Sequence, residues 1–230
     1  MSKVELSELI VSMKWQNALR KLMLRTRLRN PFTIVSNNCW GAHIYQQLGH
    51  PYQTPFVGLF VVPADYLMLL SNFRMFLSEP LTFVPLSRHA QINASRQKRQ
   101  LSYPIGRLGD EVEIQFLHYR TEHEAANAWS RRLQRICQDD DQLYFKFCDR
   151  DGCTSEQLAQ FDSLPFAHKV CFVSSPSPSL NSTVWIPNCT ERQVPDGLQL
   201  SRISPRFFDA AGWVNGTDGS PRWWNPLRCV

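Results

Sequence analysis

The chain has 230 residues, of which 43% are hydrophobic and 20% charged, a composition typical of one large folded domain rather than a disordered chain. No apolar run approaches the ~18 residues of a membrane span, and Glu5 and Glu8 stand where a secretion signal would be basic, so we expect a cytoplasmic protein. The net charge of +5 comes entirely from residues 1–30, and because the remaining residues are neutral overall, we expect no binding to nucleic acid.

Residues 1–30 are predicted to form a basic helical arm ahead of the folded domain. They hold seven Lys and Arg residues against two Glu residues, and Trp15, Leu19 and Leu22 recur at helical spacing. Two interpretations stay open. In one, the arm lies on an anionic membrane surface and holds the protein at the inner face of the membrane. In the other, it is a solvated helix packed on the domain.

From Pro31 to Ser102, short β-rich runs alternate with stretches of helical periodicity. Gly49 ends the first helical stretch, as glycine commonly does at a helix C-terminus. Residues 86–102 are polar, contain four Lys and Arg residues and no acid, and are predicted to be a loop. The predicted elements are strands at Phe32–Val35, Val57–Val62 and Leu81–Val84, and helices from the turn after Asn38 to Leu48 and from Pro63 to Leu77.

The alternation continues in the second half of the chain, where two capping boxes punctuate it. Thr121 with Glu124, and Thr154 with Gln157, have the spacing that predicts a helix N-terminus. Beyond residue 174 the sequence is rich in Ser, Pro and Trp, and it predicts no regular element. The predicted strands are Val112–Leu117, Leu143–Cys148 and Lys169–Val173, and a helix follows each of the first two.

Repeated strand–helix units of this size predict a parallel sheet, because parallel neighbours need a crossover connection and the crossover is usually a helix. We expect a doubly wound α/β fold with a mostly parallel sheet flanked by helices, in a single domain. The predicted bounds of this domain are residues 31–216. The basic arm at 1–30 precedes it, and a Trp-rich tail at 217–230 follows it.

The residues that follow each predicted strand are candidates for a functional site, because open α/β sheets bind ligands at the carboxyl ends of their strands. After the first strand come Ser36 and Cys39, in a turn that leads into a helix. Helix N-terminal N–H groups lower the pKa of a thiol and can stabilise an oxyanion, so Cys39 is the predicted nucleophile and Ser36 the alternative. The competing interpretation makes Cys39 a small buried side chain and Ser36 a helix cap.

His118 follows the strand Val112–Leu117 and is predicted to act as a general base, unless it is a hydrogen-bonded structural histidine. Asp149 and Asp151 follow Leu143–Cys148 and could orient that histidine or hold Mg²⁺ or Mn²⁺ with a sugar nucleotide. A helix N-cap and an internal pair with arginine would explain both carboxylates equally well. Further side chains at the three strand ends are predicted to contact substrate: Asn37, Asn38, Trp40, Tyr119 and Arg150.

Long segments around these candidates are distinctive: SNNCWGAHIYQQLG, VGLF, YPIGRLGDEVEIQFLHY, AWSRR and CDRDGCTSEQLAQFDSLPFAHKVCF. They resemble a bacterial family of unknown-function domains that is labelled exopolysaccharide biosynthesis. The resemblance runs from about Phe32 to Asn215 and leaves the arm and the tail outside. It implies a role in polysaccharide or capsule assembly, with a sugar or polysaccharide intermediate as partner, and it defines no reaction and no cofactor.

Three hypotheses follow for the function. In the first, the protein transfers an acyl group to a sugar, with Cys39 or Ser36 as nucleophile, His118 as base, and an oxyanion stabilised by the helix N-terminus and Asn38. In the second, it is a metal-dependent glycosyltransferase that uses Asp149 and Asp151. In the third, it is a non-catalytic partner of the polysaccharide assembly machinery, with a Trp-rich tail that stacks on sugar or protein.

Overall fold

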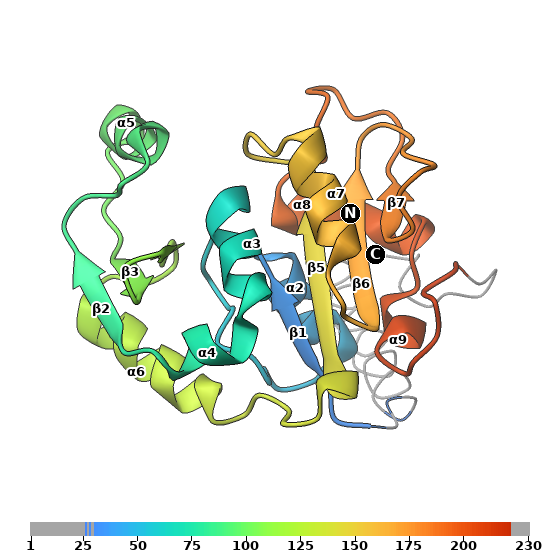
Figure 1. Cartoon of the computed structure of the whole chain (residues 1–230), viewed down its shortest axis with the longest axis horizontal. Helices are drawn as coiled ribbons and strands as arrows, with labels where there is room; N and C mark the ends of the chain where they lie inside the picture. Colours follow the sequence, from blue (N-terminus) through green and yellow to red (C-terminus); the bar gives the residue numbers. More distant parts are fainter. Residues whose placement is uncertain (1–25, 27, 29, 222–230) are drawn as a thin grey trace, which may run out of the picture.

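A computed structural model describes residues 26, 28 and 30–221 (Figure 1). The predicted arm lies outside the described residues except for positions 26, 28 and 30, and so does the predicted tail beyond residue 221. In the part that is described, no helix has the length and apolar character that crossing a bilayer requires.

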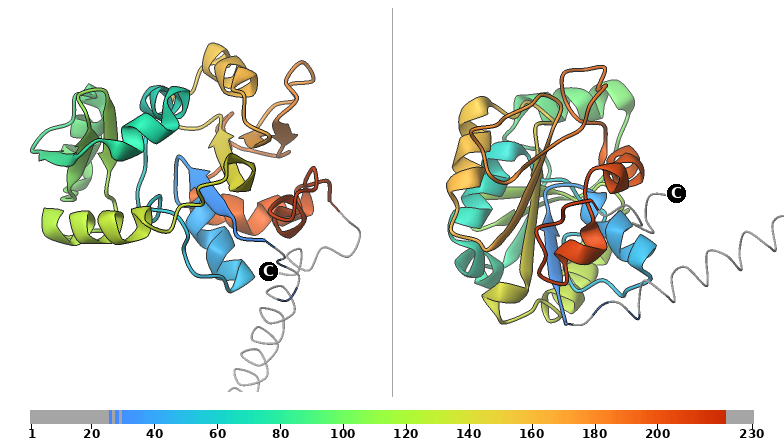
Figure 2. Two further views of the ribbon diagram at one scale, coloured as in Figure 1. Left: turned by 60° about the horizontal axis from the view of Figure 1, so that its bottom comes forward. Right: turned by 90° about the vertical axis from the view of Figure 1, so that its right-hand side faces the viewer.

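A four-stranded parallel sheet forms the centre of the fold, in the order β1-β5-β6-β7. Every residue of β1 and β5 is buried. Helices cover both faces of this sheet, as the edge-on view in Figure 2 shows, and this burial explains why its strands read as nearly continuous apolar runs. The four strands are β1 (Thr33–Ser36), β5 (Leu143–Cys148), β6 (His168–Val173) and β7 (Thr183–Trp185).

The first face of the parallel sheet packs against α3 (Pro63–Ser71), α4 (Phe73–Ser78) and α7 (Ser155–Ser163). Alternate residues of a strand point to the same face. Phe145 and Phe147 of β5 therefore share this core, where they make ring contacts with aromatic side chains of the three helices.

The second face packs against α2 (Trp40–Leu48), α8 (Gly197–Ile203) and α9 (Ala210–Trp213). Trp40 at the start of α2 is fully buried, and its ring lies 5.2 Å from that of Phe172 in β6. The turn before α2 is thereby fixed against the sheet. The structure also contains two short 3₁₀ helices, η1 (Asp140–Gln142) and η2 (Ser204–Arg206).

A three-stranded antiparallel sheet stands beside the parallel one, in the order β2-β3-β4 (Figure 1). Helix α6 packs against it, with the ring of Trp129 lying 6.1 Å from that of Phe116. Both side chains belong to the same core as α3 and α4, so the two sheets share one hydrophobic interior. The elements are β2 (Leu81–Val84), β3 (Ile105–Leu108), β4 (Val112–Gln115) and α6 (Glu122–Leu133).

Helix α5 (Ala90–Arg99) connects β2 and β3, and it has no buried residue. In Figure 1 it stands at the same end of the molecule as the carboxyl ends of the parallel strands. The prediction of a loop over residues 86–102 is therefore wrong. A helix that buries no face needs no apolar periodicity, which is the signal that the prediction relied on.

An ionic cluster anchors the segment that leads into α5. Asp65 of α3 is buried and accepts hydrogen bonds from the side chains of Arg88 and His89. Glu113 of β4 is also buried and accepts hydrogen bonds from the Ser87 hydroxyl and the Arg88 backbone N–H. Buried carboxylates are tolerated when such partners compensate the loss of hydration, so this cluster fixes the position from which α5 projects.

The predicted fold class is confirmed: the protein is a single α/β domain with a parallel sheet flanked by helices. The predicted strands Phe32–Val35, Leu81–Val84, Leu143–Cys148 and Lys169–Val173 agree with β1, β2, β5 and β6 to within one residue at each end. The helix predicted from Pro63 to Leu77 is present as α3 and α4, which meet at Asn72.

Three other predictions are corrected by the structure. Residues 57–62 form no strand, because the segment crosses between the two sheets and contacts each at single residues, through Phe60 with Gln115 and through the Val61 N–H with the Asn37 carbonyl. The strand predicted at Val112–Leu117 exists as β4, but it belongs to the antiparallel sheet. Beyond residue 174, β7, α8 and α9 are present although no pattern predicts them.

Candidate active site

The structure brings Cys39 and His118 together. Cys39 Sγ lies 3.5 Å from His118 Nε2, although the two residues are 79 positions apart in the sequence. Cys39 follows β1 of the parallel sheet, and His118 follows β4 of the antiparallel sheet. The segment at residues 57–62 runs between the sheets at this point, and its Leu59 carbonyl lies 3.9 Å from the thiol. A sulfur at this distance from an imidazole nitrogen forms the pair that thiol catalysis requires.

Cys39 occupies the N-cap position of α2 and is half-buried. Asn38 supports the turn, because its Oδ1 accepts the N–H of Trp40 at 3.1 Å. The Cys39 side chain makes no cap hydrogen bond to the first turn of the helix. The thiol is therefore free to face His118, beside the positive end of the α2 dipole.

The electrostatic environment of the thiol combines opposing influences. Burial raises the pKa of Cys39, the positive charge of Lys146 lowers it, and the negative charge of Asp196 raises it again, with a net increase. Cys39 is thus protonated at rest near neutral pH. Formation of the thiolate then requires a base, and His118 is the side chain in position to accept the proton.

His118 itself is exposed and is held through its backbone. Its N–H donates a hydrogen bond to the Gly58 carbonyl at 3.0 Å. The adjacent residue Tyr119 is buried, donates its hydroxyl to the Val57 carbonyl at 2.7 Å and accepts a hydrogen bond from Arg132. Tyr119 thus anchors the loop that carries His118, and its hydroxyl is engaged within the protein rather than facing a substrate.

Ser36, the alternative nucleophile, is completely buried at the end of β1. Its Oγ makes no hydrogen bond to any described residue. A Cβ placed on Gly41 would lie 3.0 Å from the Ser36 Cβ, which shows that the first turn of α2 covers this serine. Ser36 therefore makes no hydrogen bond to His118 within the described residues, whereas Cys39 lies beside it.

Asn37 and Trp40, which we expected to contact substrate, face the interior instead. Asn37 is fully buried and its Oδ1 accepts a hydrogen bond from Lys146 at 3.2 Å. Trp40 donates its indole N–H to Ser204 at 3.0 Å within the second core. Both residues shape the turn that presents Cys39.

Asp149 and Asp151 do not contact His118 in the part of the chain that the structure describes. Asp149 accepts hydrogen bonds from the N–H and hydroxyl of Ser174, at 2.5 and 2.6 Å, and from the N–H of Val194 at 2.8 Å. Asp151 pairs with Arg150 at 3.5 Å. The expectation that one of them orients His118 is therefore wrong, because Asp149 binds the loops after β6 and before α8, and Asp151 pairs with its neighbour Arg150.

The metal-binding alternative also depended on Asp149 and Asp151. Across residues 26, 28 and 30–221, no cluster of three or more His, Cys, Asp or Glu side chains has the arrangement of a metal site. Arg150, expected to contact substrate, uses its Nη1 to bind the Val194 carbonyl at 2.9 Å. These contacts give the three residues a structural role at the carboxyl end of β5.

Lys146 is a component of the site that sequence reasoning missed. It lies in the middle of β5 and is fully buried, and its Nζ donates to Asn37 Oδ1, to Asn38 Oδ1 at 3.0 Å and to Cys148 Sγ at 3.3 Å. The signal was present in the sequence as a lone lysine within the otherwise apolar run LYFKFC. A charged residue there is unexpected, since lysine is almost never fully buried without a partner.

A second missed contact joins the turn at Cys39 to α8. A Cβ on Gly197 would lie only 2.7 Å from the Trp40 backbone nitrogen and 3.1 Å from Asn38 Oδ1. Only glycine allows the N-termini of α2 and α8 to approach this closely. Asp196, the N-cap of α8, is thereby brought near Cys39.

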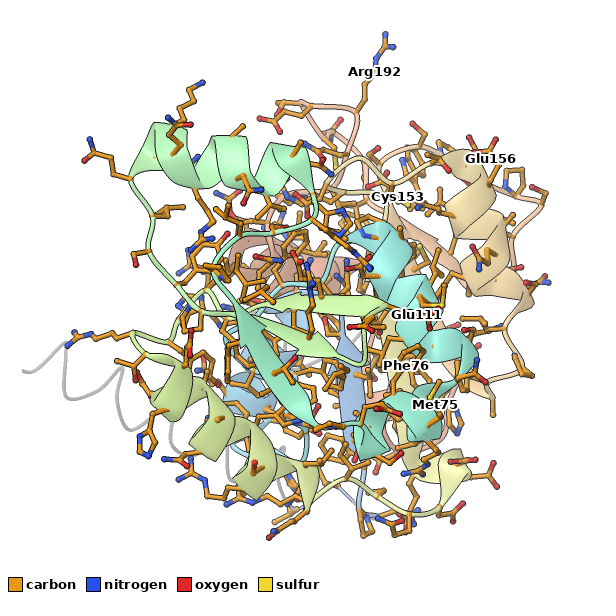
Figure 3. The ribbon with its side chains drawn as sticks, turned by 60° about the vertical axis from the view of Figure 1, so that its left-hand side comes forward. Met75, Phe76, Glu111, Cys153, Glu156 and Arg192 are labelled. Carbon is orange, nitrogen blue, oxygen red and sulfur yellow. The ribbon has the colours of Figure 1, made fainter. Side chains whose placement is uncertain are left out.

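A polar surface pocket of about 330 Å³ borders the same end of the sheet. Arg150, Gln193, Asp196 and Gln199 are among its lining residues. Figure 3 shows Arg192 and Cys153, from the loops that precede α8 and α7, at the end of the molecule where α5 also stands. The carboxyl end of the parallel sheet is therefore surrounded by loops, as expected of a ligand-binding edge.

Comparison with known proteins identifies relatives but no activity. The sequence matches a family described as a domain of unknown function, DUF1919, over residues 11–215. An uncharacterized protein of Haemophilus influenzae is 36% identical over 198 residues, which cover 84% of this chain and 88% of the relative. The match includes residues 11–31, which the resemblance had left outside, and the family description does not mention exopolysaccharide. The chain belongs to the DUF1919 family of domains of unknown function.

Proposed function

We propose that the protein is a cysteine-dependent acyltransferase in which Cys39 is the nucleophile and His118 the general base. The observation that supports this proposal is the distance of 3.5 Å between Cys39 Sγ and His118 Nε2. The location adds to it, since the pair lies at the carboxyl end of β1, where α/β sheets bind ligands. A structural role alone would leave the solvent-exposed imidazole with no reason to face the thiol.

The reaction proceeds in two half-reactions. In the first, His118 accepts the thiol proton, Cys39 Sγ attacks the acyl carbonyl, and the collapsing intermediate expels the donor's leaving group, which takes the proton from His118. In the second, His118 accepts a proton from the acceptor hydroxyl, whose oxygen attacks the thioester. The new ester leaves, and the Cys39 thiolate recovers its proton from His118.

The oxyanion of each half-reaction would be stabilised by the first-turn N–H groups of α2, which point toward the N-cap where Cys39 lies. Asn38, expected to assist, has both ends of its amide engaged within the protein. Its Oδ1 accepts from Lys146 and Trp40, and its Nδ2 lies 3.5 Å from Cys148 Sγ. We therefore assign oxyanion stabilisation to the helix backbone alone.

The acceptor we propose is a hydroxyl group of a sugar in a polysaccharide precursor. This part of the proposal is supported by the resemblance of the segments around Cys39 and His118 to domains labelled exopolysaccharide biosynthesis. The same setting would place the protein in the cytoplasm at the inner face of the membrane. The seven basic residues at positions 1–30 would supply its attraction to anionic lipid.

Trapping of the acyl-enzyme tests the proposal directly. The full-length protein is incubated with p-nitrophenyl acetate or acetyl coenzyme A, and the modified residue is identified by mass spectrometry of peptides. We expect one acetyl group on Cys39, with loss of this adduct in Cys39→Ala and a slower appearance in His118→Asn. Cys153 is a matched control, since it is also half-buried and burial raises its pKa to about 12. Acetylation that persists in Cys39→Ala, or is spread over several cysteines, would overturn the proposal.

A further inference from the structure

Lys146 is unusual because its ammonium group is fully buried and forms no contact with a carboxylate among the described residues. Its three partners are the amide oxygens of Asn37 and Asn38 and the sulfur of Cys148. None of the ion pairs in the described part of the chain includes Lys146. Burial of a charge without a counter-charge is unfavourable, because protein groups replace its hydration incompletely. A purely structural role at this position would be served at lower cost by an apolar side chain.

The position of Lys146 relates it to the nucleophile. Asn38 Oδ1 accepts hydrogen bonds from both Lys146 Nζ, at 3.0 Å, and the backbone N–H of Trp40, at 3.1 Å. The ammonium is therefore joined through one side-chain oxygen to the first turn of the helix whose N-cap is Cys39. The positive end of the α2 dipole and the buried charge thus meet at one oxygen of the residue before Cys39, and each of them favours the thiolate.

We propose that Lys146 is a positioning residue whose buried charge supplies the counter-charge for the thiolate of Cys39. This inference rests on the proposed function, since it assigns to Lys146 a part in forming the nucleophile. Asn37 and Asn38 hold the ammonium in place, and the anion that completes its environment forms only when His118 removes the thiol proton. The cost of burying Lys146 in the resting protein is then offset in the reactive state.

Other charged groups also act on this thiol and must be separated from Lys146. His118 faces it from the loop after β4, and Asp196 faces it from the N-cap of α8. Asp151, after β5, lies within the electrostatic reach of Lys146. Asp196 and Asp151 are acidic, and His118 is positive only when its exposed imidazole is protonated. Lys146 is therefore the group among these four whose positive charge does not depend on that imidazole.

The test is the pH profile of Cys39 alkylation by iodoacetamide, followed by mass spectrometry of the Cys39 peptide. Lys146→Met keeps the length of the side chain and removes its charge. We expect the profile to move to higher pH by about one unit, which makes alkylation at neutral pH about tenfold slower, while the rate at high pH equals that of the unmodified protein. A loss of structural support would instead lower the rate at every pH.

A second variant covers the outcome in which Lys146→Met does not fold. Asn37→Asp is nearly isosteric and places a carboxylate on Lys146 Nζ, so the ammonium gains a permanent partner. We expect a shift in the same direction. Lys169→Met is the matched control, because Lys169, in the neighbouring strand β6, pairs with Phe145 of β5 and donates to the carbonyls of Asp162 and Leu164 instead of to the groups around Cys39. It should leave the Cys39 profile unchanged.

The results separate the two proposals from each other. Unchanged profiles in both Lys146→Met and Asn37→Asp would overturn the role of Lys146, even if acetylation of Cys39 is observed. Shifted profiles without any acyl-enzyme would retain the role of Lys146 toward the thiol and remove acyl transfer as its purpose. Iodoacetamide makes this distinction because alkylation requires the thiolate but no acyl donor.

Discussion

The N–H of His118 donates a hydrogen bond to the carbonyl of Gly58, and this bond holds His118 beside Cys39. Gly58 has φ of +72°, a left-handed conformation that side chains other than glycine adopt at a cost. A Cβ on Gly58 would lie 3.1 Å from the Cβ of His118. The glycine therefore serves two purposes: it allows the turn, and it leaves room for the imidazole.

Gly58→Ala should displace His118 and slow the reaction of Cys39. The left-handed backbone alone costs about 1–2 kcal/mol of folding free energy. The new methyl group would also crowd the side chain of His118. We expect slower alkylation of Cys39 at neutral pH together with this loss of stability, measured by urea denaturation.

Gly109→Ala is the control for this prediction. Gly109 also has positive φ, +57°, but the nearest atom to a Cβ there is Glu79 Cγ at 3.9 Å. It should lose similar stability and keep the reactivity of Cys39. Equal reactivity in the two variants would show that Gly58 does not position His118.

Ser36→Ala should leave the chemistry intact and cost the protein no stability. The buried Oγ of Ser36 has no hydrogen-bond partner among the described residues. Removal of an unsatisfied hydroxyl removes a desolvation penalty of about 1–3 kcal/mol and opens only a small space. We therefore expect the free energy of unfolding to stay the same or to rise, and acetylation of Cys39 to continue at the original rate. A loss of acetylation in Ser36→Ala would restore this serine as the nucleophile.

The parallel sheet was predictable from the sequence because strands that are buried on both faces consist mostly of apolar residues. β5 reads LYFKFC and β6 reads HKVCFV, and the Thr154–Gln157 box marks the helix between them. The structure contains this capping box as predicted, with both of its hydrogen bonds. Elements that bury little, such as α5 and the three-residue strand β7, give no comparable signal.

The hypothesis that pairs Cys39 with His118 assumed an arrangement of strands that the structure corrects, although the two residues do meet. His118 was expected to follow a strand of the same parallel sheet, so that both residues would share one edge. It follows β4 of the antiparallel sheet instead, and the segment at residues 57–62 joins the two sheets. Pairing between sheets depends on contacts distant in the sequence, which local periodicity does not encode. Lys146 escaped prediction for a similar reason, since its partners Asn37 and Asn38 come from another strand end.

Gly197→Ala should disturb the turn at Cys39 from the opposite side. The added methyl group would stand 2.7 Å from the Trp40 nitrogen, closer than real contacts allow, and backbone on both sides prevents relaxation. Overpacking of this kind costs about 1–3 kcal/mol. We expect lower stability in urea denaturation and a changed rate of Cys39 alkylation.

We expect the alkylation of Cys39 in Gly197→Ala to become faster. Movement of α8 away from α2 carries Asp196 away from the thiol, and since the negative charge of Asp196 raises the pKa of Cys39, its removal favours the thiolate. Asp196→Asn should change the rate in the same direction without the loss of packing. An unchanged rate in both variants would contradict the placement of Asp196 beside the site.

Glu113→Gln should weaken the stability of the protein at neutral pH and flatten its dependence on acid. Burial by itself would raise the pKa of Glu113, but hydrogen bonds from Ser87, Arg88 and Gln115 and the charge of His89 hold it below its usual value. A carboxylate whose pKa is lower in the folded state stabilises the fold above its unfolded pKa, about 4.3. That contribution is lost as the pH falls through the folded pKa.

Urea denaturation at a series of pH values from about 7 down to about 3 measures this effect. Glu113→Gln keeps the shape of the side chain but ends its charge-assisted hydrogen bonds, each worth about 1.5–3 kcal/mol. The variant should therefore start less stable and lose less stability in acid. Glu111→Gln is the matched control, because Glu111 is exposed and lies in the turn between β3 and β4, two residues before Glu113. Parallel curves for the unmodified protein and Glu113→Gln would show that the cluster anchoring α5 does not depend on the ionisation of Glu113.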